Sequence, residues 1–418
     1  MGTRVDLIGW GGDGMGIVNA LVGLVARHED LWSAYRATSE VSRINSPHRP
    51  LVVGAAPDSG GGVLVSEETD RLLSEALVLA RATGESFNPL VGPLVAAWDV
   101  AAMRAAYVAG APLPPAPAPG LVEAALEASS PELLTRVGER RWLLRDPGVA
   151  ERAALSARPL QAHREGTRPS PRLDLGGIAK GYTADACRDL AAELGASGVL
   201  VSVGTSSIAV HGTRADSSPW RVGMRDPNGG EANVSGVVEL PADGMASLST
   251  SGDNLGPLGA RRAQMPPGAP SRARDHHIID PRTGEPARSG VRQVSVVASC
   301  GVLAEALSTA LLVDPSLEVG DVVARWSRAS GLTASARGWS APCSDEHRRS
   351  GASGARKVAG PRGSVEEAQG GSVSGRLPAP AREHSRGCSY TAPPLPADAC
   401  AQAGHLMGSV TPDRERYT

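Results

Sequence analysis

Aromatic residues, lysine and cysteine are all scarce in this sequence. Aromatic side chains make up 3% of the 418 residues and Phe87 is the single phenylalanine, so leucine, valine, isoleucine and alanine must fill the core. The five cysteines form no CxxC pair and no Cys/His metal spacing, which favours reduced thiols over a zinc site. The formal net charge of −2 argues against a protein that binds nucleic acid through a basic surface.

Long apolar runs and leader segments are also missing. No stretch reaches the roughly 20 apolar residues that a transmembrane helix needs, so we expect no membrane span. A signal peptide begins with a charged segment followed by an apolar one, and this pattern is absent, so we expect no signal peptide. We therefore expect a cytoplasmic protein, or an exported one if the natural start lies upstream of Met1.

Hydrophobic periodicity predicts a protein built from both helices and strands. Apolar residues at spacings of three and four predict helices, and short apolar runs next to glycine predict buried strands. Ser66 is expected to cap the second helix, and Gly84 to end it. The predicted helices cover residues 17–35, 67–83, 178–194 and 301–312, and the predicted strands cover 5–10, 198–204, 207–212 and 293–299.

The composition of the chain changes near Asp314. From Leu317 onward it is rich in Gly, Ser, Arg, Pro and Ala and has little periodicity. Such a segment buries too little apolar surface to offset the entropy lost on ordering. We expect two parts, a folded domain at 1–316 and a low-complexity, disordered tail at 317–418.

Only two of the 42 basic side chains are lysines, and Lys180 lies in the motif LDLGGIAKGYTAD. An apolar strand end carries Asp174, two glycines permit a tight turn, and a helix follows. Free N–H groups at a helix start attract phosphate, and a lysine one turn into the helix adds a point charge. The motif suits a diphosphate, but an ordinary strand–turn–helix with surface charges is equally compatible.

Three further motifs carry polar groups suited to chemistry. In HHIIDPRTG (276–284), two histidines precede an Asp-Pro turn; histidine suits proton transfer near neutral pH, although such a pair is more often structural. Glu305 and Thr309 are four residues apart on one helix face, where their oxygens form either a Mg²⁺ site or a solvated surface. SLSTSGD (247–253) alone is typical of a loop.

The segment GWGGDG (9–14) satisfies the G-x-G-x-x-G pattern of dinucleotide-binding folds. Glu29 and Asp30, the acidic residues at the appropriate distance, fall inside the predicted helix instead of at a strand end. No second strand follows at the expected spacing, so a plain glycine loop is favoured over a Rossmann dehydrogenase.

The order of the motifs resembles the ApbE family of FAD:protein FMN transferases over about residues 1–316. The resemblance implies an α+β fold with T-fold-like mixed sheets flanked by helices and an FAD cleft between lobes. It also implies Mg²⁺-dependent transfer of FMN from FAD to a threonine hydroxyl of an acceptor protein, with release of AMP. The segments that carry it are SAYRATSEVSRIN, SFNPLVGPLVAAW, LDLGGIAKGYTAD, VSVGTSSIAVHG, WRVGMRDP, STSGD, HHIIDPRTG and VSVVASCGVLAEALSTALLV.

The same resemblance implies roles for individual residues. His277 matches the proposed general base. Glu305 stands where the family usually has aspartate, and Asn88 also replaces an aspartate. These departures keep two alternatives open, an FAD-binding protein without turnover and an FAD pyrophosphatase giving FMN and AMP. The implied metal ligands are Gly177 through its carbonyl, Glu305 and Thr309, and the implied FAD contacts are Met1, Tyr35, Ser86, Phe87, Asn88, Asp174, Lys180 and Ile279.

Overall fold

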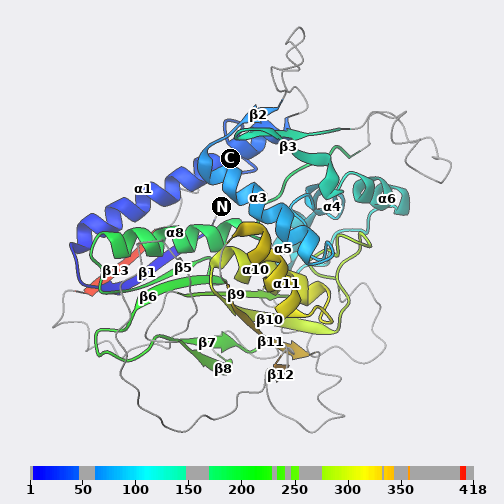
Figure 1. The fold of residues 1–418 in the computed structure, drawn as a ribbon. Coiled ribbons are helices and arrows are strands. Elements are labelled where there is room, and N and C mark those ends of the chain that lie inside the picture. Colours follow the sequence, from blue (N-terminus) through cyan, green and yellow to red (C-terminus); the bar gives the residue numbers. More distant parts are fainter. Residues whose placement is uncertain are drawn as a thin grey trace, which may run out of the picture.

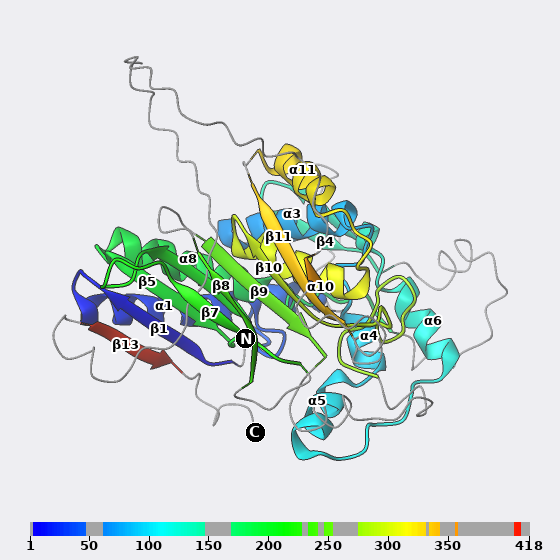
Figure 2. The same cartoon turned by 90° about the horizontal axis from the view of Figure 1, so that it is seen from below.

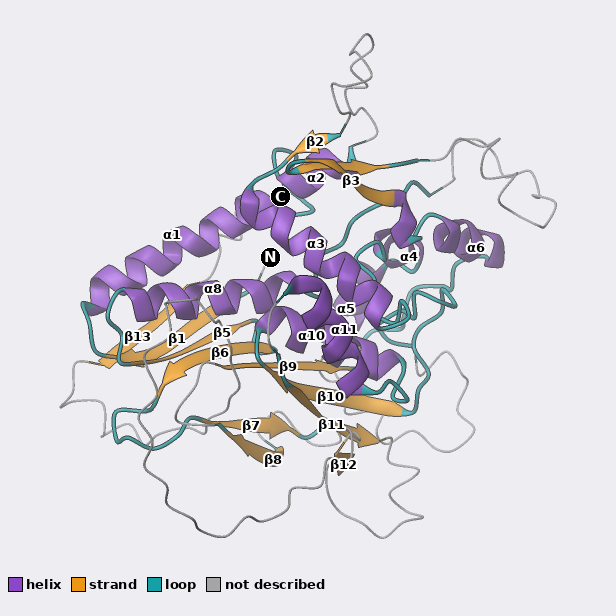
Figure 3. Cartoon of the chain, in the orientation of Figure 1, coloured by secondary structure: helices purple, strands orange, loops and turns teal. Residues whose placement is uncertain are grey.

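An eight-stranded sheet forms the centre of the molecule, and helices cover one of its faces (Figures 1 and 3). The computed structural model describes residues 3–46, 62–146, 169–227, 233–240, 246–253, 275–331, 334–342, 356–357 and 405–410. Every pair of neighbouring strands in these ranges is antiparallel. In order across the sheet, the strands are β12 (Arg356–Lys357), β11 (Ala336–Pro342), β10 (Val291–Ala298), β9 (Ala246–Gly252), β6 (Ser207–Gly212), β5 (Gly198–Val203), β1 (Val5–Trp10) and β13 (His405–Val410).

The helical layer has three long members next to the sheet. These are α1 (Gly14–Trp32), α8 (Ala179–Glu193) and α10 (Gly301–Val313). Two more, α3 (Glu67–Ala82) and α11 (Val319–Ser330), pack against each other on the outer side of α10. The shorter helices are α2 (Glu40–Asn45), α4 (Gly92–Ala97), α5 (Val100–Ala109), α6 (Pro119–Glu127) and the 3₁₀ turn η1 (Pro131–Leu133).

Two small sheets complete the described architecture. One is three-stranded, in the order β2 (Val63–Leu64), β4 (Arg141–Leu144), β3 (Leu134–Gly138). The other is the hairpin of β7 (Arg221–Arg225) and β8 (Val234–Glu239), which covers the face of the large sheet that the helices leave open (Figures 1 and 2). Trp220 and Met224 from the hairpin region pack there against Leu248 and other outward-facing side chains of the large sheet.

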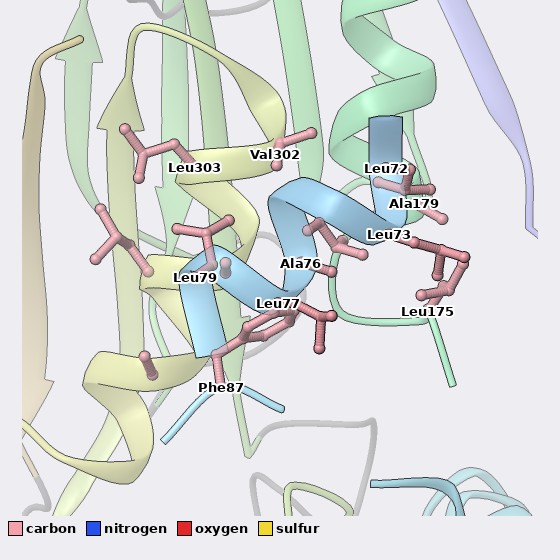
Figure 4. Packing of buried hydrophobic residues seen from close by; sticks show 14 of the residues in the cluster. Leu72, Leu73, Ala76, Leu77, Leu79, Phe87, Leu175, Ala179, Val302 and Leu303 are labelled. Carbon is pink, nitrogen blue, oxygen red and sulfur yellow. The ribbon is translucent and has the colours of Figure 1, made fainter. Parts of the chain in front are cut away.

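The largest apolar cluster lies where α3 crosses the starts of α8 and α10 (Figure 4). Every residue of α10 except Thr309 is buried, because the sheet covers one side of this helix and α3 covers another. Phe87, the single phenylalanine, is 4% exposed and belongs to this cluster. The core is therefore built mainly from aliphatic side chains, as the composition predicts.

The α+β class and most of the predicted elements are confirmed. Strand β1 has the predicted bounds, and Ser66 caps α3 by accepting a hydrogen bond from Thr69 N at 3.3 Å. The described strand pairs are all antiparallel, a more uniform arrangement than the expected mixed sheets. The Rossmann alternative is wrong, because β1 runs antiparallel to β5 and the described residues after GWGGDG contain no parallel βαβ unit.

Two expectations from the sequence need correction. SLSTSGD is not a loop: its first six residues belong to β9, and Ser247 and Ser249 are buried. The core also continues past the expected boundary at residue 316, because α11 buries Val322 and Trp326 against α3. Beyond α11, β11 pairs with β10 and β13 pairs with β1. Most of 343–418 lies outside the described residues, so its disorder stays a prediction.

No helix in the described part of the chain has the length and apolar character needed to cross a bilayer. This agrees with the absence of long apolar runs from the sequence.

Candidate functional site

The starts of α8 and α10 cross in direct backbone contact. A Cβ atom added at Gly181 would lie 2.2 Å from the Gly301 carbonyl oxygen, and one added at Gly301 would lie 2.2 Å from the Gly181 carbonyl oxygen. Only glycine permits this approach, because any side chain at either position would meet backbone. The crossing brings the positive ends of two helix dipoles to one place.

Each helix supplies a carboxylate to the first turn of the other. Asp185 Oδ2 of α8 accepts a hydrogen bond from Gly301 N at 2.6 Å, and Glu305 Oε2 of α10 accepts one from Gly181 N at 2.6 Å. These bonds satisfy N–H groups that have no partner within their own helix. The two helices are thus capped reciprocally, which fixes their relative position at the crossing.

Lys180 and Glu305 form an ion pair at the same crossing. Lys180 Nζ donates to Glu305 Oε1, and also to the Gly176 carbonyl oxygen at 2.6 Å. The Glu305 side chain is 3% exposed, so the alternative of a solvated helix face is wrong. A carboxylate removed from water in this way requires a compensating charge, which the Lys180 ammonium provides.

The turn before α8 is held on both sides. Asp174 Oδ1 accepts from Gly176 N at 2.8 Å, and Asp174 N donates to the Pro89 carbonyl oxygen at 2.9 Å. Asn45 makes two bonds to the backbone of Leu173, accepting from its N–H at 2.7 Å and donating to its carbonyl at 3.0 Å. The strand end predicted here is wrong, because residues 169–175 form neither strand nor helix. Two distant segments hold Asp174 in place instead.

Gly177 lies between the aromatic and hydroxyl groups of the candidate site. A Cβ atom added at Gly177 would lie 3.4 Å from Phe87 Cε2 and 3.9 Å from Thr309 Oγ1. Thr309 follows Glu305 by one helical turn, so both side chains project from one face of α10. The three residues predicted to bind metal are thus neighbours.

A row of serine hydroxyls on β9 faces α10. Ser251 Oγ lies 3.1 Å from Thr309 Oγ1 and 2.9 Å from Ser308 Oγ, and Ser308 donates to Ser249 Oγ at 3.3 Å. The alternation of strand side chains brings residues 247, 249 and 251 to one face, where the helix residues supply their hydrogen-bond partners. Ser251 consequently fixes the Thr309 hydroxyl.

Asp185 sits in a buried polar group behind the crossing. Arg188, whose side chain is 2% exposed, donates to Asp185 Oδ1 at 3.0 Å and to Asp189 Oδ1 at 2.9 Å. Ser247 also donates to Asp185 Oδ1. Burial raises the pKa of the Asp185 carboxyl, and Arg188 and Ser247 act in the opposite direction.

The predicted FAD contacts at 86–88 follow α3. Asn88 donates from Nδ2 to the Ser129 carbonyl oxygen at 2.8 Å and accepts from Leu90 N at 2.8 Å. A carboxylate at this position could accept from Leu90 but not donate to Ser129, so the amide has its own structural use here. Ser86 Oγ is buried and has no hydrogen-bond partner among the described residues.

The two histidines of HHIIDPRTG have different surroundings. His276 is 5% exposed; its Nε2 lies 2.8 Å from the Ala287 carbonyl oxygen and its Nδ1 accepts from Ile278 N at 3.3 Å. Both ring nitrogens of His276 thus serve the fold, while His277 is half-buried beside it. Ile278 packs against the core cluster that contains Phe87, so this segment reaches the same core.

Two predicted FAD contacts lie in other surroundings, and a third falls outside the described residues. Ile279 is 4% exposed and packs with Leu94 and Trp98 in a separate apolar cluster. Tyr35 lies beyond the end of α1 with 83% of its surface exposed. Met1 is not among the described residues. The FAD roles of these three residues, like those of the other predicted contacts, stay predictions.

A surface cavity of about 580 Å³ opens near the end of α3. It adjoins Ser129, the partner of Asn88, but neither Lys180 nor Glu305 lines it. Its lining residues are Arg81, Gly84, Glu85, Leu126, Ser129, Ser130, Pro281 and Arg282.

The structure adds three residues to the site that lie in the quoted motifs but had no predicted role: Asn45, Asp185 and Ser251. Their roles depend on partners 58 to 128 residues away, so no local spacing reveals them. The one available signal was the period-two placement of serine at 247, 249 and 251, which is typical of a strand.

The donor chemistry of the site suits a hard cation. A carboxylate, a hydroxyl and a backbone carbonyl are the oxygen ligands that Mg²⁺ accepts. Within the described ranges no group of three or more His, Cys, Asp or Glu side chains gathers around one point. Any metal at this site would therefore rely on one carboxylate and on neutral oxygens.

Comparisons with known proteins agree on one family. A model of the ApbE family matches residues 1–332. The FAD:protein FMN transferase of Treponema pallidum is 32% identical over 297 residues, which cover 69% of this chain and 69% of that protein. The FAD:protein FMN transferase of Haemophilus influenzae is 26% identical over 293 residues, covering 69% and 70%.

Two solved structures share the fold. The flavin transferase ApbE from Vibrio cholerae aligns with a TM-score of 0.55 at 22% identity, covering 83% of this chain and 89% of that one. The ApbE protein from Thermotoga maritima aligns with a TM-score of 0.52 at 25% identity, covering 78% and 86%.

Proposed function

The chain belongs to the ApbE family, and we propose that it transfers the FMN portion of FAD to an acceptor protein. The observation that supports this most is the Lys180–Glu305 pair beside the crossing of α8 and α10, with Gly177 and Thr309 near each other one helical turn further along α10. Positive helix ends and a compact ammonium suit an anionic diphosphate, and FAD contains one. The shared site favours the diphosphate interpretation of LDLGGIAKGYTAD over an ordinary turn.

We infer that the Gly177 carbonyl, Glu305 and Thr309 would hold Mg²⁺ or a similar divalent cation. When bound, such an ion would stabilise the negative charge that develops on the pyrophosphate oxygens. Glu305 is already oriented by the Gly181 N–H, and Thr309 by Ser251. The protein's contribution is to hold these oxygens in place before the substrate arrives.

The proposed reaction is a phosphoryl transfer to a threonine of the acceptor. The threonine oxygen bonds to the FMN phosphorus, the bond from that phosphorus to the bridging oxygen breaks, and AMP leaves with that oxygen. A hydroxyl is a weak nucleophile and needs a base within hydrogen-bond reach. His277 is our candidate for that base, because His276 already bonds within the fold through both ring nitrogens.

FAD itself would contact the segments on either side of the crossing. The Ser86 hydroxyl has no partner among the described residues, which supports a polar contact there, since a buried hydroxyl without a partner is costly. Met1 enters this set through the family resemblance alone. The proposed contacts are Met1, Tyr35, Ser86, Phe87, Asn88, Asp174, Lys180 and Ile279.

We also propose that the transferase unit extends past residue 316 and includes α11. Trp326 is 1% exposed and packs in the same core as Phe87, so a chain cut at 316 would expose that core. Limited proteolysis with and without FAD tests this boundary, and a stable core that ends before α11 would contradict it.

The direct test of function uses the full chain, FAD, MgCl₂ and an acceptor protein that carries the family's target threonine. We expect an acceptor band that stays fluorescent after denaturation and one AMP per labelled acceptor. A matched acceptor with valine for that threonine should remain dark. FMN and AMP in equal amounts without labelling would support the pyrophosphatase instead.

Tight FAD binding with no AMP under any divalent cation would support a binding protein without turnover. One observation favours this alternative: both Glu305 oxygens already accept hydrogen bonds, from Lys180 and Gly181.

The variant His277→Ala should lower the transfer rate by about 10²- to 10⁴-fold if His277 is the base. His211→Ala is the control, since His211 lies half-buried at the end of β6 and has no proposed role. Equal rates for both variants would remove His277 from the mechanism.

A further inference from the structure

The Lys180–Glu305 ion pair involves a proposed metal ligand, so it affects how a cation can bind at the proposed site. The ammonium is bound on two sides, to Glu305 Oε1 and to the Gly176 carbonyl. Its side chain is 23% exposed, whereas that of Glu305 is 3% exposed. The lysine therefore supplies the charge that the buried carboxylate requires, and it does so from the solvent side of the pair.

We propose that Lys180 competes with a divalent cation for Glu305, and that occupation of the site releases the ammonium toward the substrate diphosphate. The competition rests on the proposed metal ligands and the release rests on the proposed function. A role for Lys180 as an FAD contact does not by itself imply either the competition or the release. The lysine would then have two successive partners, a carboxylate and a phosphate.

The two oxygens of Glu305 differ in how freely their partners can move. Oε2 accepts from Gly181 N, which the backbone contact between Gly181 and Gly301 holds in place. Oε1 accepts from Lys180, whose ammonium sits at the end of a flexible four-carbon chain. A cation that takes Glu305 as a ligand therefore meets a fixed donor on one oxygen and a movable one on the other.

Charge decides which partner stays. An ammonium and a divalent cation within a few ångströms of one another repel strongly in a site largely removed from water. Hard cations also prefer carboxylate to any other side chain present at the crossing. Once the cation holds Glu305, the ammonium keeps only its bond to Gly176, and an anion nearby becomes its best partner.

The scarcity of lysine makes this proposal easy to test. Lys180 and Lys357 are the only two lysines in the chain, so acetylation by acetic anhydride followed by peptide mass spectrometry reports each side chain separately. On the full chain without FAD, saturating MgCl₂ should raise the acetylation rate of Lys180 about fivefold or more. Lys357 is the internal reference and should not change. Thr309→Val, which removes a proposed ligand, should abolish the rise.

Calorimetry with MgCl₂ gives a second readout that does not involve activity. Removing the competitor in Lys180→Met should tighten Mg²⁺ binding about tenfold, which corresponds to ~1.4 kcal/mol. Lys180→Arg retains the charge and should show no such gain. If Lys180→Met does not fold, the labelling of the unaltered chain still decides the question.

The outcomes separate this proposal from the function. Mg²⁺ binding with no change in Lys180 labelling, or equal affinity in Lys180→Met, would overturn the competition and leave the transferase standing. Absence of Mg²⁺ binding in both the unaltered chain and Lys180→Met would overturn the metal site and the competition together. Flavin transfer that proceeds in EDTA would reject the metal requirement separately.

Discussion

Gly181 of α8 and Gly301 of α10 touch through their backbones, and this contact places the two halves of the candidate site. On one side of it lies the Lys180–Glu305 pair, and on the other lies Asp185. Both carboxylates reach across the contact to cap the opposite helix. A change in the separation of the helices would therefore disturb the caps and the ion pair at once.

The first prediction concerns that contact. Gly181→Ala places a methyl group 2.2 Å from the Gly301 carbonyl oxygen, so α8 and α10 must separate. We expect a loss of about 2–4 kcal/mol in the free energy of unfolding, as in other overpacked or strained core sites. Gly23→Ala in α1 is the control: its Cβ meets nothing within 4 Å, so it should stabilise by about 0.5–1 kcal/mol. Urea unfolding of both variants measures the difference, and equal effects would show that the contact is not tight.

The second prediction concerns the buried charges behind the crossing. Asp185→Asn removes the charge that faces Arg188, whose side chain is 2% exposed, and should cost about 3 kcal/mol of unfolding free energy. Asp189→Asn removes the second partner of the same arginine. Because Asp189 is 20% exposed, water can replace it, and we expect a cost below about 1 kcal/mol. Thermal or urea unfolding would contradict this ranking if Asp189→Asn proved the more damaging change.

The third prediction concerns the hydroxyl that orients Thr309. Ser251→Ala removes the group 3.1 Å from Thr309 Oγ1, so the threonine gains rotamer freedom and should bind Mg²⁺ about three- to tenfold more weakly. Thr250→Val is a matched control on the same strand, because Thr250 points to the other face and bonds to Ser295 at 2.8 Å. Calorimetry should show unchanged Mg²⁺ affinity for Thr250→Val, and a similar loss in both variants would indicate a general effect on β9.

The secondary structure was largely predictable from the sequence because its signals are local. Apolar periodicity located α3, α8 and α10, and a serine cap marked the start of α3. Strand β9 was missed for a physical reason. Serine, threonine and glycine favour turns when they stand alone, but here three serines find partners on α8 and α10. Those partners lie about 60 residues away in sequence, so the strand can be identified only from the tertiary fold.

The candidate site was predictable only as separate pieces. Lys180 and Glu305 lie 125 residues apart, and no spacing rule connects them. The order of motifs placed both in one family and assigned one to FAD and the other to metal, yet it did not predict that they bond to each other. Asn88 shows the same limit: the sequence presents it as a lost charge, whereas the structure shows an amide that donates to Ser129.

The last prediction concerns pH and the packing of α1 on α8. His28 is 1% exposed and its ring lies 4.3 Å from that of Trp32, centroid to centroid. Thr183 Oγ1 donates its proton to the Ala179 carbonyl, so His28 Nδ1 must be the donor in its 3.0 Å bond to Thr183. In the neutral ring the proton therefore lies on Nδ1, and charging the ring would require a second proton inside the core.

Burial accordingly lowers the pKa of His28 from 6.5 to about 4. As the pH falls below 6.5, His28 takes up a proton in the unfolded chain, but in the folded chain it does so only near pH 4. His28 therefore lowers the free energy of unfolding progressively between these two pH values. The effect amounts to about 3 kcal/mol. His28→Asn keeps a donor near the Nδ1 position but has no titration. The unfolding free energy of the unaltered chain minus that of His28→Asn should therefore shrink by about this amount between pH 7 and pH 4. A difference that stays constant over that range would mean that His28 carries its charge in the folded protein, and that the packing of α1 on α8 tolerates an imidazolium.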